Sequence, residues 1–272
     1  MQQFDLRVTI NGNPVSQAAI QANELERYHA AATLLVDRLN QQQDAIAVDR
    51  AAVSKVDQLN QDPHVSLAEI KAAVVDLKMK IGDEQMRRLL QADTQYMSNQ
   101  YSKLPKPAHS YNQAHVVIGA TGISMEEFFG WWAGRKTVND ERQMLIANPE
   151  HYLVATTQVN GSQGQELIET MGEFEKTMYY NLHFTNDPDN YPIPRNESYP
   201  KFMCVVGHDV ATGKDAGITA FHQFKDENGH FKANLNLFFS TALPKELATG
   251  HVLHLAIEFS NWIRAAHNND QN

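Results

Sequence analysis

The stretch HVLHLAIEFSNWI, residues 251–263, decides the fold of the second half of this chain. It belongs to a longer helical pattern that Pro244 opens and that ends near Ala266, since proline suits the first position of a helix. A helix of this length, at about 1.5 Å per residue, crosses a whole β-sheet. Its spacing gathers one broad apolar face, which needs a cover. That face consists of Leu255, Phe259, Trp262, Ile263 and Ala266.

Six short runs ahead of this helix have the composition of β-strands. They are rich in β-branched and aromatic residues and are separated by turn signals, which is typical of an antiparallel sheet. The turns ATGKD (211–215) and DENGH (226–230) predict that the last three strands form consecutive hairpins. The six runs are QAHVVIGA (113–120), YLVATTQV (152–159), KTMYYNLHFT (176–185), KFMCVVGHDV (201–210), AGITAFHQF (216–224) and FKANLNLFF (231–239).

Together these elements predict an α+β protein in which a curved antiparallel sheet closes over the long C-terminal helix. This plan resembles the helix-grip fold of the Bet v 1 and START-like proteins. A sheet of this kind leaves a cavity between its concave face and the helix, and such cavities are common ligand sites.

The N-terminal part of the chain has a different texture. Residues 14 to about 100 are dominated by helix formers, and SLAE at 66–69 is a capping box that starts a helix. The proline-flanked KLPKPAHS (103–110) indicates a linker. We therefore divide the chain into a helical N-terminal region, 1–105, and a helix-grip domain, 106–272. The amphipathic pattern IKAAVVDLKMKI (70–81) needs a cover, and for this reason we expect a homodimer.

Charge and cysteine content restrict the partners and the compartment. The net charge of -9 and the pI near 5.7 argue against nucleic acid and anionic membranes, because both select basic surfaces. Cys204 is the only cysteine, so no intrachain disulfide forms. No segment has the roughly 18 apolar residues of a membrane span, and the N-terminus shows no signal-peptide pattern. We expect a cytoplasmic protein that acts on a small molecule.

The C-terminal helix also carries groups that bind metals. His254 and Glu258 are four residues apart and His251 stands one turn earlier, so an imidazole and a carboxylate reach a common point. The alternative is an ordinary His–Glu hydrogen bond, because a metal site needs three or four ligands. Two other places supply further ligands. His151 stands at the mouth of a strand, and a glutamate-rich stretch containing Glu166, Glu169, Glu173 and Glu175 precedes the next strand.

Four stretches, taken in order, resemble the 2,4-diacetylphloroglucinol hydrolase family. They are FFGWWAGRK, NPEHY, IETMGEFEKTMYYNLHF and HLAIEFSNWI, and the resemblance covers about residues 112–267. It implies a helix-grip domain that holds a single Zn²⁺ with two His and two Glu. Carried onto this sequence, the ligands are His151, Glu169, His254 and Glu258, with Glu173 and Glu175 as alternatives to Glu169.

The resemblance further implies an enzyme that hydrolyses the carbon–carbon bond between an aromatic ring and an acyl group. The substrate is then an acylated phenol or a similar aromatic ketone. Trp131 and Trp132 are candidates for the cavity wall. Tyr179 and Tyr180 point to opposite faces of one strand, so one of them is expected to face the substrate.

Two other functions remain open at this stage. The first is a helix-grip protein that binds a hydrophobic ligand without turning it over, in which His254 and Glu258 are hydrogen-bonded only to each other. The second makes residues 14–100 the functional part, and it requires an apolar stripe exposed on those helices together with an occluded cavity.

Overall fold

The computed structural model describes residues 3–101, 103–105, 110–138, 140–159, 162–171 and 176–269. Within this part of the chain, nine antiparallel strands form one sheet in the order β2-β1-β3-β9-β8-β7-β6-β5-β4. The strands are β1 (Asp5–Ile10), β2 (Asn13–Val15), β3 (Tyr111–Thr121), β4 (His151–Val159), β5 (Ser162–Thr170), β6 (Thr177–Thr185), β7 (Lys201–Asp209), β8 (Asp215–Glu227) and β9 (His230–Ser240).

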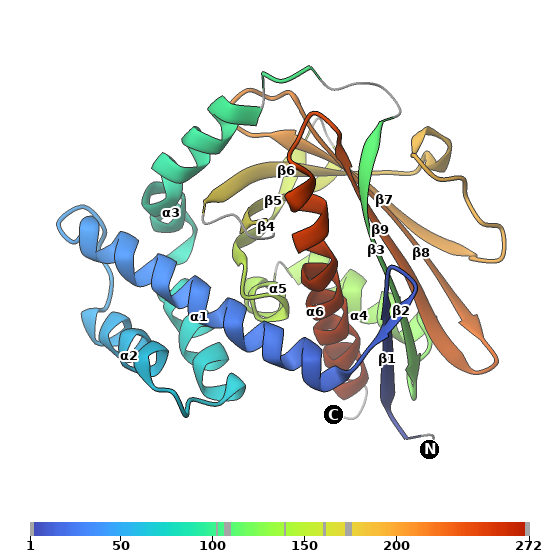
Figure 1. The fold of residues 1–272 in the computed structure, drawn as a ribbon, viewed down its shortest axis with the longest axis horizontal. Helices are drawn as coiled ribbons and strands as arrows, with labels where there is room; N and C mark the ends of the chain where they lie inside the picture. The colour runs from blue at the N-terminus through green and yellow to red at the C-terminus, as the bar shows by residue number, and fades with distance from the viewer. Residues whose placement is uncertain are drawn as a thin grey trace.

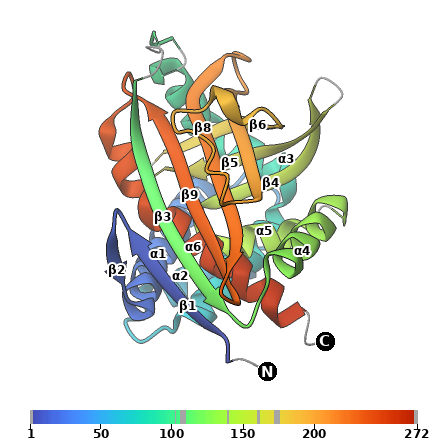
Figure 2. The same ribbon diagram turned by 90° about the vertical axis from the view of Figure 1, so that its right-hand side faces the viewer.

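Six α-helices accompany the sheet in the described residues. The C-terminal helix α6 packs on β1, β3 and β9 and also contacts α1, α4 and α5 (Figure 1). Seen from the side of the sheet, the long strands β3, β8 and β9 run across α6, which lies behind them (Figure 2). The helices are α1 (Gln17–Gln41), α2 (Arg50–Gln61), α3 (Leu67–Tyr101), α4 (Met125–Val138), α5 (Glu141–Ala147) and α6 (Lys245–Asn269).

The arrangement confirms the α+β helix-grip fold expected from the sequence. The core between the sheet and α6 contains Leu255, Phe259 and Ile263, which come from the apolar face of the helix. These side chains pack against alternate residues of β3 and β9, because successive side chains of a strand point to opposite faces. The helix is therefore held by the same apolar stripe that predicts it.

Local signals in the sequence explain where several elements begin and turn. Ser66 and Glu69 form the expected capping box, with the Ser66 amide donating to Glu69 and the Glu69 amide donating to Ser66. Ser124 and Glu127 do the same at the start of α4. At the β8–β9 turn, Asn228 has a φ of 54°, in the left-handed region that asparagine tolerates.

Helices α1, α2 and α3 form a layer of their own, which we call the helical layer. It packs on β4, β5 and β6 and buries a second core that contains Ile70, Val74, Leu77 and Ile168. The amphipathic stripe of residues 70–81 thus finds its cover within the same chain. Residues 70–81 therefore do not form the exposed stripe that a functional helical region requires, and the homodimer stays a prediction. The division of the chain at residue 105 stays a prediction.

Three strands were not expected from the sequence. β1 and β2 lie ahead of the helices and extend the sheet beside β3. β5 covers Ser162–Thr170, a stretch that we took as a glutamate-rich connection. It pairs with both β4 and β6, although its polar side chains hide the usual strand composition. None of the helices in the described residues combines the length and the hydropathy needed to cross a membrane.

Candidate metal centre

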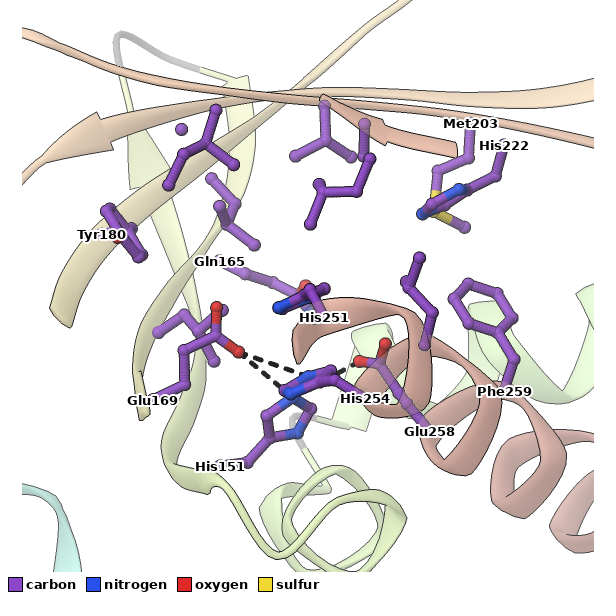
Figure 3. A pocket seen from close by; sticks show the side chains of 18 of the residues that line it. His151, Gln165, Glu169, Tyr180, Met203, His222, His251, His254, Glu258 and Phe259 are labelled. Carbon is purple, nitrogen blue, oxygen red and sulfur yellow. Dashed lines mark hydrogen bonds and ion pairs between the residues drawn. The ribbon is translucent and has the colours of Figure 1, made fainter. Parts of the chain in front are cut away.

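The structure brings the four predicted ligands to one end of the cavity between the sheet and α6. His151 is the first residue of β4 and is paired in register with Glu169 of β5. His254 and Glu258 lie one turn apart on α6, facing these two strands (Figure 3). Residues from three elements thus meet because β4 and β5 are neighbours and α6 crosses in front of them.

The distances between the donor atoms are short. His151 Nε2 lies 3.2 Å from His254 Nε2, and Glu169 Oε2 lies 3.6 Å from the first nitrogen and 3.4 Å from the second. Glu258 Oε1 lies 3.4 Å from His151 Nε2. Ligands bound to a tetrahedral zinc ion at about 2.0–2.1 Å are separated by roughly 3.3 Å. The observed spacing therefore matches the spacing that a zinc ion requires.

The cluster has a tight centre and one more peripheral member. Ligand atoms of His151, Glu169 and His254 all lie within 4.8 Å of one another, and all three residues are buried. Glu258 reaches this group through its contact with His151 and is slightly more open, with 12% of its side chain exposed. Three protein ligands beside a more open position are the pattern of catalytic zinc sites. Glu258 as the fourth ligand stays a prediction.

Hydrogen bonds on the far side of each imidazole decide which nitrogen faces the cluster. His151 Nδ1 lies 3.2 Å from the carbonyl oxygen of Met144. Since a carbonyl only accepts, Nδ1–H donates there and the Nε2 of neutral His151 carries a lone pair. His254 Nδ1 lies 2.8 Å from Glu150 Oε2, and Glu150 is paired with Arg27. The carboxylate accepts from this nitrogen, so the Nε2 of His254 also carries a lone pair.

Two nitrogen lone pairs that face each other at 3.2 Å repel unless a cation lies between them. Burial also raises the pKa of the Glu169 and Glu258 carboxyls well above their usual range, so without a positive partner they hold a proton, which a bound divalent cation would replace. Burial also lowers the pKa of His151 to about 4, which keeps this imidazole neutral. Neutral imidazoles and buried carboxylates are the groups that a divalent cation binds, so the residues fit a metal ion.

The cavity beside the cluster measures about 100 Å³ and has largely apolar walls. Trp132 and Tyr180 line it, whereas Trp131 and Tyr179 do not. Tyr179 faces the helical layer, where its hydroxyl contacts Glu166 and Arg87. The other apolar lining residues include Leu167, Met171, Leu182, Phe184, Met203, Val205, Ile218, Leu237, Phe259 and Trp262.

The alternatives to Glu169 are placed as follows. Glu166 lies on the opposite face of β5 and forms a bidentate ion pair with Arg87 at 2.6 and 2.7 Å. The strand alternation that sends Glu169 into the cavity thus sends Glu166 to the helical layer. Glu173 and Glu175 lie outside the described residues.

Two further histidines line the cavity, and neither was selected from the sequence. His222 of β8 accepts a hydrogen bond at Nδ1 from the backbone amide of Asn236 at 3.1 Å, so its proton sits on Nε2. Burial lowers the pKa of His222 to about 3, which keeps the ring neutral. The strand pattern of AGITAFHQF places His222 on the same face as Ile218 and Ala220, and this alternation was the available signal.

His251 is the second of these residues. Its ring stacks on that of His254 with centroids 4.1 Å apart, and its Nδ1 has no hydrogen-bond partner among the described residues. The stacking supports the orientation of the His254 ring from the cavity side. His251 was noted from its position one turn before His254, but not as a member of the cavity wall.

Comparison with known protein families and with curated proteins finds no match for this sequence. Among solved structures, the chain is similar to the crystal structure of Ara h 8.0201, with a TM-score of 0.35 and 11% sequence identity. The match covers 59% of this chain and 97% of that chain. A likeness this distant carries no function, so the functional argument comes from the site itself.

Proposed function

We propose that this chain is a metal-dependent hydrolase that cleaves a carbon–carbon bond in an acylated phenol or a similar ketone, with Zn²⁺ as its cofactor. The observation that carries the proposal is the meeting of His151, Glu169 and His254, with Glu258 beside them, at the end of an apolar cavity. The sequence resemblance to the 2,4-diacetylphloroglucinol hydrolase family supports the same reaction.

The ligand atoms of His151, Glu169, His254 and Glu258 would hold the ion. A divalent ion held there supplies a Lewis acid for an acyl oxygen and lowers the pKa of water toward about 7. Imidazole and carboxylate ligands suit zinc as well as other first-row divalent ions. His151, Glu169 and His254 are buried, and electrostatic contacts in such a low-dielectric site are stronger than in water.

The other residues of the cavity favour a largely apolar substrate with an oxygen acceptor. The aliphatic and aromatic walls suit a ring and an acyl chain. His222 offers a neutral Nε2–H, which donates to a carbonyl or phenolic oxygen and does not act as a proton store near neutral pH. In the reaction the oxygen of one water molecule forms a bond to the acyl carbon, and the bond between this carbon and the ring breaks with its electron pair on the ring carbon. That carbon takes a proton in place of the one that water loses, so a carboxylic acid and a phenol are released.

The competing function, a ligand carrier without catalysis, makes a different prediction for α6. It requires His254 and Glu258 to satisfy each other. Instead, the polar side-chain contacts of His254 within the described residues run to Glu150, His151 and Glu169, and the contact of Glu258 runs to His151. This arrangement favours the metal site over a simple His–Glu pair.

The test is metal analysis of the purified protein together with release of carboxylic acid from a panel of acylated phenols. We expect close to one zinc per chain and acid release by the wild type. His254→Ala and Glu258→Gln are expected to lose most of the metal and the activity. His183→Ala is the matched control, because His183 packs against His208 away from the cavity. Stoichiometric zinc that survives both site substitutions would contradict the proposal.

A further inference from the structure

The ligand-bearing start of β4 is tied to the helical layer by two basic side chains. Arg27 of α1 forms an ion pair with Glu150, the residue directly before His151. The same guanidinium donates through Nη2 to the carbonyl oxygen of Gly250 on α6 at 2.9 Å. Arg27 therefore links the two elements that supply His151 and His254.

Glu150 completes the link by contacting a ligand directly. Its Oε2 atom, which accepts from Arg27, is also the atom 2.8 Å from His254 Nδ1. The side chain is 7% exposed, so this carboxylate is nearly removed from water. A buried carboxylate is costly unless it is paired, and here Arg27 supplies the countercharge.

Lys78 of α3 holds the other side of the same turn. Its Nζ donates to the carbonyl oxygens of Pro149 at 2.6 Å and His151 at 2.5 Å, and it lies 4.7 Å from the centre of the Tyr152 ring. The amide side of the turn is fixed as well, because the Glu150 amide donates to Asn148 Oδ1 at 2.9 Å. The backbone around His151 thus has little freedom to move.

We propose that Arg27 and Glu150 form a positioning pair for the metal centre, in which Glu150 fixes the ring of His254 and Arg27 fixes Glu150. The inference rests on the metal site of the proposed function. A carboxylate that accepts from the outer nitrogen of a ligating histidine sets its tautomer and ring orientation and raises its basicity. The helical layer, which offers no candidate ligand of its own, then contributes to metal binding through Arg27.

The charges of the assembly are consistent with this role. A divalent cation with the two carboxylates Glu169 and Glu258 is neutral overall, and the Arg27–Glu150 pair adds no net charge. Removing one member of the pair leaves the other charged and buried beside a ligand, so the effect reaches the metal centre.

The experiment compares zinc affinity, measured by chelator competition, with the visible spectrum of the cobalt(II)-substituted protein. The variants are Glu150→Gln, Arg27→Met and the charge-preserving Arg27→Lys. The control is Glu24→Gln. Glu24 is an equally buried α1 carboxylate that accepts from Lys71 at 2.7 Å and from Asn261 at 2.8 Å, without contacting a ligand.

We expect Glu150→Gln and Arg27→Met to weaken zinc binding by about 10- to 100-fold and to change the cobalt spectrum. Arg27→Lys is expected to retain more of the affinity, and Glu24→Gln to match the wild type in both measurements. Circular dichroism confirms that each variant is folded before it is compared.

Three results would overturn the inference. If Glu150→Gln and Arg27→Met bind zinc like the wild type with an unchanged cobalt spectrum, the pair does not position the ligand, while the metal site itself stands. If Glu24→Gln weakens zinc binding as much as they do, the effect is general destabilisation. A wild-type protein that binds neither zinc nor cobalt would overturn both this inference and the proposed function.

Discussion

Removing the metal is expected to lower the stability of the fold. The ligands come from β4, β5 and α6, so they meet only in the folded chain and the ion binds the folded state selectively. Free zinc at a hundred times its Kd then stabilises the fold by about 2.7 kcal/mol. For a chain near this size, each kcal/mol shifts Tm by roughly 2–4 °C. The expected difference between zinc-loaded and chelator-treated protein is therefore roughly 5–11 °C.

The assay is thermal unfolding followed by circular dichroism or calorimetry, at a fixed pH and a buffered free zinc concentration. Glu258→Gln tests whether the metal, and not the carboxyl itself, stabilises the fold. Without metal this change removes a buried carboxyl whose pKa burial raises, so it is expected to leave the apo-protein equally or more stable. With zinc present it is expected to reduce the gain in Tm. Equal melting temperatures with and without zinc in the wild type, or a full gain in His254→Ala, would refute the reasoning.

Four further outcomes are expected. His222→Phe removes the N–H donor and is expected to lower kcat/KM by about 10- to 100-fold, which is typical for the loss of a hydrogen bond to a charged oxygen. Metal analysis of this variant is expected to show unchanged zinc. Gly207→Ala places a Cβ 3.5 Å from the carbonyl oxygen of Ile218, an ordinary contact, so Tm is expected to hold or rise while KM rises as the cavity shrinks. Burial raises the pKa of the Cys204 thiol to about 11, so a thiol reagent is expected to react only in denaturant. Burial raises the pKa of Glu141 from 4.5 to about 7, so between these pH values the folded state holds a proton that the unfolded state releases. Stability is therefore expected to fall as the pH rises from 4.5 to about 7. Glu141→Gln is expected to flatten this slope in urea titrations.

Much of the fold follows from local patterns in the sequence. The alternation in the strand runs, the turn at Asn228 and the capping boxes at Ser66 and Ser124 act over a few residues, so one sequence is enough to read them. β5 was missed for a physical reason. Its cavity face carries Gln165 and Glu169, and its outer face carries Glu166, so polar residues occupy both sides of a strand that is nonetheless covered on both.

The site was predictable only where its geometry is local. The four-residue spacing of His254 and Glu258 follows from the helix, and His151 stands out at the start of its strand. The glutamate-rich stretch offered four candidates, and only the resemblance selected Glu169 among them. The contact between Arg27 and Glu150 could not be predicted from the sequence, because the two residues are 123 positions apart in the chain. A weak signal existed, since NPEH places a carboxylate directly beside a candidate ligand at the start of a buried strand.

The position of the centre between the two cores explains why distant residues bear on it. In β5, Glu169 faces the cavity while its neighbour Ile168 packs in the core of the helical layer. At the start of β4, Glu150 contacts Arg27 while the next residue, His151, contacts Glu169 in the metal centre. Because adjacent residues serve both sides, we expect a shift of α1 or α3 to displace the metal ligands. Substitutions in the helical layer are therefore expected to change metal affinity more than equally buried substitutions around Phe238, on the outer face of the sheet away from the cavity.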